Sequence, residues 1–486
     1  MLNLATLRTP GVYIDEERKF PPSVAQVETA IPVFIGYTEQ ARKDGRDVFN
    51  EGIRISSLLE YVEIFGEAQS EQNLVVTIDQ QTRGANQIVK EFVNADINFA
   101  AGGASRHNMF YALQVYFANG GGPCWIISVA AYLPFGTEIP SLLLESALQE
   151  VAARLDEPTL IVFPEGQGMQ EAGYYTLINL ALQQCEELKD RFVVFDIHNS
   201  GRGLRLSGDI DAVATGFRAD GQIGALTVDR AKYGAAYFPN IRSTFDYRFQ
   251  ESAVTIVHNV NNQPSGEFNG VTLDAISNGA MRSKAAQAVR NLFIYLPPSP
   301  AIVGVYARVD SNRGVWKAPA NEGISSVADI AVRLDDVQQR NFNVDTGNGL
   351  SINVIRRFVD RGIRVWGART LAGNDNEWRY IPVRRFFNMV EESVKKATYQ
   401  FVFEPNDINT WIRVKGMIEN FLVLQWRAGA LQGATPEKAY YVKVGLGETM
   451  TALDILEGRM IVEIGMAVVR PAEFIILRFS HKMVEA

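Results

Sequence analysis

The chain has 486 residues, of which 47% are hydrophobic and 21% are charged, and its formal net charge is −8. This length is typical of roughly two to four domains, and the composition excludes an intrinsically disordered protein. The acidic balance excludes broad nucleic-acid binding, because that activity requires a basic surface. We therefore expect a folded protein that has no nucleic-acid partner.

The N-terminal half is predicted to begin with an arm and to continue as alternating strands and helices. Val12, Tyr13 and Ile14 form a short strand candidate, and a strand this short needs a pairing partner to be stable. The other predicted elements are strands at 31–37, 125–129, 159–163 and 191–197, and helices at 57–65, 109–117, 142–155 and 174–188. This alternation predicts a largely parallel sheet with helices on its faces.

Two middle segments depart from this rhythm. Residues 67–108 are rich in Gln and Asn and show little periodicity, which predicts a surface loop or a small insertion. Residues 253–257 and 271–273 flank a Gly/Asn-rich stretch, which predicts a hairpin. The elements predicted further on are helices at 283–296, 299–313 and 325–340, with an extended segment at 315–320.

Residues 361–407 are predicted to fold as strand, turn, strand and helix. Residues 373–376 have turn composition, and residues 378–381 alternate as a returning strand. Apolar residues recur at three- and four-residue spacing from 387 to 401, which indicates an amphipathic helix. We expect the arginines of this stretch to be exposed. Arg384 and Arg385 would then either contact an acidic partner or form a solvated strand end.

The C-terminal part is predicted as a helix at 408–426, capped by Asn406 or Asp407, followed by strands at 439–444 and 460–469. The final run, 474–479, is strongly β-forming and apolar on both faces. At a free sheet edge such a strand would promote aggregation. The strand candidates at the two chain ends therefore either exchange with neighbouring copies or fold back on their own subunit.

The residue types needed for catalysis, metal binding or cofactor binding are not arranged for it. Asp196, His198 and Ser200 are close in the sequence, but a catalytic triad is assembled from distant segments, and no Gly-x-Ser-x-Gly motif is present. The four histidines lack metal-ligand spacing, and no complete nucleotide-binding glycine motif occurs. We therefore expect no enzymatic activity, no metal and no cofactor.

Compartment is predicted from the cysteines and from the N-terminus. Cys124 and Cys185 are expected to be free thiols, with Cys185 on the polar side of a helix, and a single bridge between them is the alternative. Charged residues at 15–19 replace the apolar core of a signal peptide, and no apolar run reaches the about 18 residues of a membrane span. We expect cytoplasmic synthesis, no membrane insertion, and any release by lysis or a dedicated route.

Ten short motifs, in order along most of the chain, resemble the contractile tail sheath proteins of phage tails, R-type pyocins and extracellular contractile injection systems. They are Thr9–Tyr13, Thr29–Pro32, Phe34–Thr38, Phe117–Trp125, Trp316–Asn321, Arg364–Thr370, Val383–Arg385, Phe403–Asp407, Gly429–Gly433 and Arg470–Ile475. Residues 67–108 and 200–280 depart from the pattern, and these are the segments in which family members vary.

The resemblance implies a multidomain α/β and α+β fold with a conserved inner domain built from both chain ends. The implied parts are an N-terminal arm (1–30), a central α/β region (31–350) with outward variable insertions at about 67–108 and 200–280, an inner sheath domain (351–470) and a C-terminal arm (471–486). The arms would add strands to neighbouring subunits. The residues implied for this exchange are Val12, Tyr13, Ile14, Phe474, Ile475, Ile476, Leu477 and Phe479.

The function that the resemblance implies is structural. The subunit would stack as hexameric rings around an inner tube, with baseplate and terminal cap proteins as further partners, and would contract to drive the tube into a target envelope. Candidate tube contacts are Lys395, Lys396, Arg413 and Lys415. Two other classes stay open from the residues themselves: an α/β enzyme, from the strand–helix rhythm, and a receptor- or glycan-binding particle protein, from the variable middle.

Overall fold

The computed structural model describes residues 24–84, 87–198, 207–345, 347 and 349–477, and these form two compact units. The larger unit contains residues 28–388 and the C-terminal segment from residue 470, whereas the smaller unit contains residues 24–27 and 389–469. The chain therefore passes between the units at three points, 27/28, 388/389 and 469/470. The predicted arm residues Val12, Tyr13, Ile14 and Phe479 lie outside the described residues.

An eight-stranded sheet organises the larger unit, in the order β16-β15-β10-β9-β8-β1-β7-β4. The inner strands run parallel, and the two edge strands pair antiparallel with their neighbours. In chain order the strands are β1 (Pro32–Thr38), β4 (Gly52–Ile55), β7 (Cys124–Ala131), β8 (Leu160–Val162), β9 (Phe192–Asp196), β10 (Gly234–Phe238), β15 (Ile352–Phe358) and β16 (Gly362–Trp366). The mixed α/β class and the parallel sheet predicted from the sequence are confirmed.

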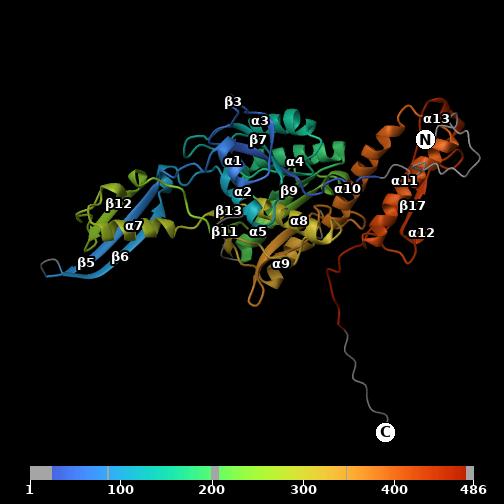
Figure 1. Cartoon of the computed structure of the whole chain (residues 1–486). Coiled ribbons are helices and arrows are strands. Elements are labelled where there is room, and N and C mark those ends of the chain that lie inside the picture. Colours follow the sequence, from blue (N-terminus) through green and yellow to red (C-terminus); the bar gives the residue numbers. More distant parts are fainter. Residues whose placement is uncertain (1–23, 85–86, 199–206, 346, 348, 478–486) are drawn as a thin grey trace, which may run out of the picture. The chain divides into compact units, whose positions relative to one another are not determined.

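Side chains alternate between two cores, one on each face of this sheet. On β1, Val33 and Ile35 belong to one core and Phe34 to the other. Helices cover both faces (Figure 1). The first core includes residues of α3 (Ser141–Ser146), α4 (Glu171–Leu188), α5 (Ser207–Ala219), α6 (Val228–Ala231) and α9 (Asp336–Asn343), and the second includes residues of α1 (Leu58–Phe65), α2 (Met109–Ala118) and α8 (Ser299–Arg313). The strands are continuous apolar runs because both of their faces are covered.

A second, three-stranded sheet has its own core within the larger unit. β5 (Leu74–Arg83) and β6 (Gln87–Ile97) form a long hairpin, β12 (Thr255–Val260) pairs parallel with β5, and α7 (Gly279–Arg290) packs against them (Figure 1). The predicted surface loop is therefore wrong, and residues 67–108 contribute to a small inserted layer. Leu74, Val76 and Ile78 are buried at the two-residue period of a strand.

Other local predictions fail where a distant partner decides the structure. Residues 253–257 and 271–273 lie antiparallel as predicted, through the bridge between Thr255 and Thr272 and backbone hydrogen bonds such as Ile256 N–H to the Val271 carbonyl, but 271–273 form no strand, and the other edge of β12 pairs with β5. The helix predicted at 325–340 is a strand followed by α9, and that strand belongs to a small sheet. This sheet consists of β11 (Ile241–Ser243), β13 (Tyr295–Leu296) and β14 (Val327–Ile330). A separate two-stranded hairpin is formed by β2 (Arg42–Lys43) and β3 (Arg46–Asp47).

The smaller unit is built on two helices and a two-stranded sheet. α10 (Ile381–Thr398) enters this unit at Met389, and the predicted strand at 378–381 is reduced to a bridge at Tyr380. The other elements are α11 (Ile408–Arg427), α12 (Pro436–Ala439), α13 (Ala452–Leu456), β17 (Tyr440–Lys443) and β18 (Glu463–Met466). The compact unit thus starts at residue 389 rather than 351, because β15 and β16 extend the large sheet.

The two stretches of sequence that form the smaller unit contact each other. The backbone N–H of Val27 donates to the Ser393 hydroxyl (3.1 Å), and the Gln425 amide donates to Gln26 (3.1 Å). Residues 24–27 therefore lie against α10 and α11, almost 400 positions away in the chain. This is the expected arrangement of a domain built from both chain ends.

Cys124 and Cys185 are both buried free thiols. The alternative of a single bridge is therefore excluded. The predicted place of Cys185 on the polar side of its helix is wrong, because its side chain belongs to the core beneath the sheet.

Candidate assembly site

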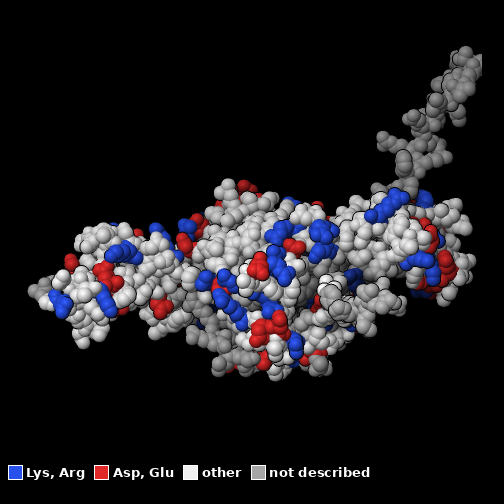
Figure 2. Space-filling model, turned by 90° about the horizontal axis from the view of Figure 1, so that it is seen from below, with Lys and Arg blue, Asp and Glu red and all other residues white. Residues whose placement is uncertain are grey.

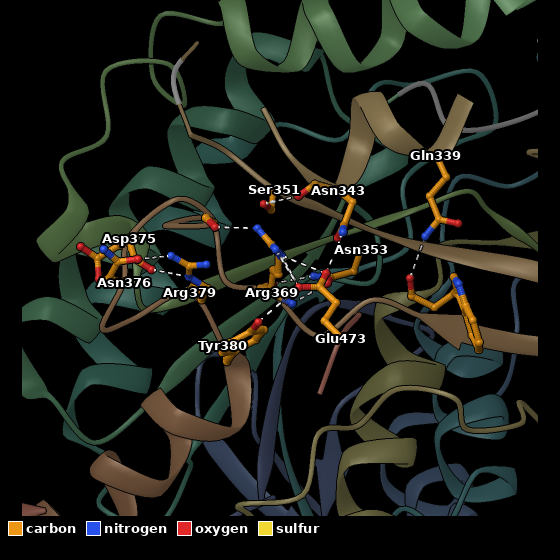
Figure 3. Close-up of polar contacts among 12 residues, drawn as sticks. Gln339, Asn343, Ser351, Asn353, Arg369, Asp375, Asn376, Arg379, Tyr380 and Glu473 are labelled. Atoms are coloured by element: carbon orange, nitrogen blue, oxygen red, sulfur yellow. Dashed lines mark hydrogen bonds and ion pairs between the residues drawn. The ribbon is translucent and has the colours of Figure 1, made fainter. Parts of the chain in front are cut away.

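The C-terminal segment is held in the larger unit by a cluster around Glu473 (Figure 3). Arg369 donates to both carboxylate oxygens, with Nε at 3.1 Å from each and Nη2 at 2.7 Å from Oε2. The Asn343 amide donates to Oε1 at 2.7 Å, and the Tyr380 hydroxyl donates to Oε2 at 3.3 Å. Three side chains that lie 93 to 130 positions earlier in the sequence therefore converge on one carboxylate.

Arg369 is itself held rigidly by the edge of the large sheet. Its backbone N–H donates to the Asn353 side chain (2.8 Å), whose amide donates back to the Arg369 carbonyl (2.7 Å). Its Nη1 donates to the Gly373 carbonyl (2.8 Å). Gly367 permits this approach, because a Cβ there would lie 2.7 Å from the Asn353 oxygen. The guanidinium therefore has a fixed partner besides Glu473, and with both in place its side chain is only 5% exposed.

The Glu473 carboxylate is ionised in this cluster. Burial raises its pKa, but the hydrogen bonds from Arg369 and Asn343 outweigh burial and hold the pKa below its ordinary value. A lowered folded-state pKa means that the ion pair stabilises the segment fully above the ordinary glutamate pKa and is lost as the pH falls through the lowered value. The Arg369–Glu473 ion pair therefore anchors the C-terminal segment at neutral pH.

Directly after Glu473 the chain becomes exposed and apolar. Phe474, Ile475, Ile476 and Leu477 are 70–79% exposed. The strand predicted over 474–479 is not formed within the chain over its described part, residues 474–477. A strand needs a hydrogen-bonding partner, and nothing in the described chain supplies one to these four residues. The sequence predicted the apolar segment after residue 473. It did not predict that the Glu473 carboxylate anchors this segment to Arg369.

The smaller unit also leaves apolar residues and strand edges uncovered. β17 and β18 pair only with each other along their named length, so in the described part of the chain each has an open outer edge. Large apolar side chains on this unit are exposed. They are Tyr399, Val402, Phe403, Ile408, Ile412, Leu424, Tyr441, Leu446, Leu453, Leu456 and Ile461. These exposed apolar side chains are candidates for contacts in an assembly.

Phe403 stands out among these residues. It is fully exposed and its φ is +70°, in a region that a bulky side chain rarely adopts. The conformation costs about 1 kcal/mol or more, and no apolar burial of the Phe403 side chain offsets it in the part of the chain that the structure describes. This strain and exposure make Phe403 a candidate contact residue in an assembly.

The four candidate tube-contact residues lie on the two long helices of the smaller unit. Lys395 (52% exposed) and Lys396 (37% exposed) both pair with Glu392, at 3.0 and 3.4 Å. Arg413 pairs with Glu404 at 2.9 Å, and Lys415 is half-buried. The face in Figure 2 shows basic and acidic side chains interspersed, rather than one basic surface.

Arg384 and Arg385, predicted to be exposed, are buried. Arg384 is 2% exposed, donates to Asn388 (2.7 Å) and lies over the rings of Tyr233 and Trp378. Arg385 is 3% exposed and pairs with a buried aspartate. Both predicted alternatives are therefore wrong. These residues begin α10 instead of ending a strand, and the helix directs both side chains into the unit.

The Asp196 and His198 side chains do not form a catalytic pair. Ser299 donates its backbone N–H (2.7 Å) and its hydroxyl (2.5 Å) to Asp196, and His198 Nε2 lies 3.0 Å from the Met169 carbonyl. Burial raises the pKa of Asp196 to about 7. Ser200 lies outside the described residues. Among the described residues, no group of three or more His, Cys, Asp or Glu could hold a metal ion, and no helix is long and apolar enough to span a bilayer.

Comparison with known proteins places this geometry in a family. Two family models match: the phage tail sheath protein central domain over residues 253–371 and the phage tail sheath C-terminal domain over residues 373–482. The helical sheath of the anti-feeding prophage in its contracted state is 30% identical, with a TM-score of 0.62 over 98% of this chain and 100% of that one. The chain belongs to the contractile tail sheath family.

Other relatives of this sheath protein agree. The sheath of an extracellular contractile injection system, PVC, in the contracted state is 28% identical, with a TM-score of 0.63 over 98% of both chains. The tail sheath proteins of Burkholderia phage BcepMu and Vibrio phage KVP40 are each 29% identical, over 117 and 131 residues, or 23% and 26% of this chain. These matches span only 24% and 19% of the phage proteins.

Proposed function

We propose that this sheath protein polymerises as stacked hexameric rings around an inner tube and drives the tube into a target envelope when it contracts. The observation that carries the proposal is the exposed apolar segment Phe474–Leu477, anchored one residue earlier by Glu473. The relatives of known structure are sheath polymers and baseplate complexes, which supports an assembled rather than a monomeric state. Contacts with tube, baseplate and terminal cap proteins belong to the same proposal.

Strand exchange between subunits would join two features that each lack a strand partner in the described part of one chain. Phe474–Leu477 from one subunit would add a strand to the β17–β18 sheet of a neighbour, satisfying backbone groups on both sides. Burying four large apolar side chains contributes roughly 6–12 kcal/mol before the cost of association. That gross gain is large enough to link subunits firmly. The N-terminal arm, including Val12, Tyr13 and Ile14, would add a further strand.

Contraction requires no chemistry in the subunit. Linked subunits that have two alternative packings change state when the more compact packing becomes favoured. The strands exchanged between neighbours would persist while the contacts between units rearrange. Lys395, Lys396, Arg413 and Lys415 would face the tube. Half of the Lys395 and Arg413 side chains is exposed, 52% and 50%. A structural role without catalysis agrees with relatives that are themselves tail sheath proteins.

Microscopy of the purified protein tests the proposal. The full chain is expected to form rings or tubes in negative stain, and a variant lacking residues 1–14 is expected to stay a folded monomer. Circular dichroism and melting temperature establish that the truncated chain is folded. A full chain that stays monomeric and shows a ligand-dependent activity would contradict the sheath role, and a truncated chain that still forms tubes would contradict exchange by the N-terminal arm.

A further inference from the structure

A second buried arginine grips the chain at its N-terminal passage between the units. Arg385 Nη1 lies 3.1 Å from Asp310 Oδ1, and its Nη2 lies 2.5 Å from Oδ2. The same Nη2 donates to the Thr29 carbonyl (2.8 Å), and the Thr29 hydroxyl donates to Asp310 (2.6 Å). The Arg385 and Asp310 side chains are only 3% and 6% exposed. Thr29 is thus fixed two residues after the chain leaves the smaller unit.

The two arginine sites share one design. In each, a guanidinium held on the larger unit binds a carboxylate through two nitrogen atoms. Arg369 does so at Glu473, four residues after the passage at 469/470, and Arg385 does so beside Thr29, near the passage at 27/28. Arg385 also lies on α10, which carries the chain through the third passage at 388/389. All three passages therefore have a buried charged contact on the larger unit's side.

Buried ion pairs are poor devices for stability but good devices for geometry. The loss of hydration offsets much of their attraction, so apolar residues of similar size would stabilise a fold as well. A two-pronged guanidinium–carboxylate contact instead fixes distance and direction, because both hydrogen bonds must be made together. The placement of such contacts at the passages indicates a positional role.

We propose that Arg369 and Arg385 are positioning residues that fix where the chain leaves the larger unit, and that Arg369 thereby sets the register of the donated C-terminal strand. This rests on the proposed function. Because Glu473 is fixed, Phe474 and Ile476 face one side of the donated strand and Ile475 and Leu477 the other. A slip of one residue would exchange the two faces.

Insertions between Glu473 and Phe474 test the register directly. One inserted serine exchanges the faces of the donated strand, and two inserted serines restore them, so we expect the yield of sheath to fall about tenfold with one and to recover largely with two. The arm is exposed, so neither insertion acts on the core of the free subunit. Equal yields from the two insertions would overturn a register set by Glu473.

The mobility of a nitroxide spin label on the free subunit tests the grip itself. The label is placed at Ile475→Cys, since Cys124 and Cys185 are buried and Ile475 is exposed. Glu473→Gln is expected to increase the mobility of this label while leaving amide hydrogen exchange of β15 and β16 unchanged. The matched control is Glu51→Gln, which removes a two-pronged partner of Arg46 at 2.9 and 3.0 Å on the exposed surface and is expected to change neither readout. Unchanged label mobility in Glu473→Gln would overturn the grip.

The N-terminal grip has a milder variant of its own. Asp310→Asn leaves Arg385 buried without its charge partner and is expected to lower the melting temperature. Thr29→Val is therefore compared with it, because Thr29→Val removes one hydrogen bond and no charge. Faster exchange at residues 24–31 and a lower sheath yield are expected from Thr29→Val, and unchanged values for both would overturn the role of Arg385. A wild-type chain that forms no rings or tubes would instead reject the proposed function and leave the label mobility and the hydrogen exchange to decide the grips.

Discussion

The two units of the sheath protein differ in how completely each buries its own apolar side chains and pairs its own strands. In the larger unit, helices cover both faces of the eight-stranded sheet, and strands such as β9 and β10 are buried along their whole length. In the smaller unit, a sheet of two strands has open edges, and apolar side chains such as Phe403 and Leu456 are exposed. The described part of the larger unit buries most of its strands within the chain, whereas under the proposed function neighbouring subunits cover the exposed strand edges and apolar side chains of the smaller unit.

The largest effect that separates the units is expected from the core of the larger one. Phe192 lies on β9 with no exposed surface, so Phe192→Ala should lower the free energy of unfolding of the free subunit by about 3–5 kcal/mol through lost burial and a cavity. Urea denaturation measures this. Phe192→Leu, which retains most of the volume, is the control, and an equal loss in both variants would contradict a tightly packed sheet.

The next effect is a pH dependence of the larger unit. Burial raises the pKa of Asp196 from its ordinary 3.8 to about 7, so the folded chain binds more protons than the unfolded chain between these values. This contribution to stability is present below pH about 4 and is lost as the pH rises to about 7. Asp196→Asn should flatten the profile, removing roughly 2–4 kcal/mol of variation. A profile that keeps its slope in the variant would exclude Asp196 as its source.

The smallest effect on stability, and the most informative for the smaller unit, is expected at Phe403. Asparagine adopts a positive φ more readily than phenylalanine, so Phe403→Asn should stabilise the free subunit by about 0.5 kcal/mol. The same change should reduce sheath formation, because it removes an exposed aromatic contact. Melting temperature and sedimentation measure the two outcomes separately.

Val359→Asn provides the matched control for that prediction. Val359 is equally exposed, in the turn between β15 and β16 of the larger unit, and should change neither stability nor assembly by a measurable amount. If Val359→Asn reduces assembly as strongly as Phe403→Asn, the contrast between the two units is wrong.

Sequence reasoning was most successful where local pattern and final environment agree. The helix at 299–313 and the strand at 31–37 were predicted within one residue, because one is bounded by Pro300 in its first turn and by Gly314 at its end, and the other is an apolar run buried on both faces. The cap of α11 by Asp407, which accepts from the Thr410 N–H at 3.0 Å, follows from local chemistry in the same way. These elements need no distant partner.

The failures share the opposite property. Arg384 and Arg385 have the sequence pattern of surface residues, and only aromatic rings and Asp310, brought from elsewhere in the chain, make their burial possible. Glu473 was part of a recognised motif, but its role depends on Arg369, 104 positions earlier. The apolar segment 474–477 was identified from its sequence pattern, whereas the residues that hold Glu473 could be identified only in three dimensions.

The central claim is that the exposed C-terminal segment of one subunit completes the β17–β18 sheet of another. Crosslinking tests it most directly, since Cys124 and Cys185 are buried and should not react. Two double variants are made, one with Ile476→Cys and Lys443→Cys and one with Ile476→Cys and Glu463→Cys. The second cysteine lies on β17 in the first variant and on β18 in the second, so a short bismaleimide can report an added strand at either edge of the sheet. We predict covalent multimers from assembled protein of at least one chain and none from monomers. Assembled sheaths of both chains without intermolecular crosslinks would contradict the account.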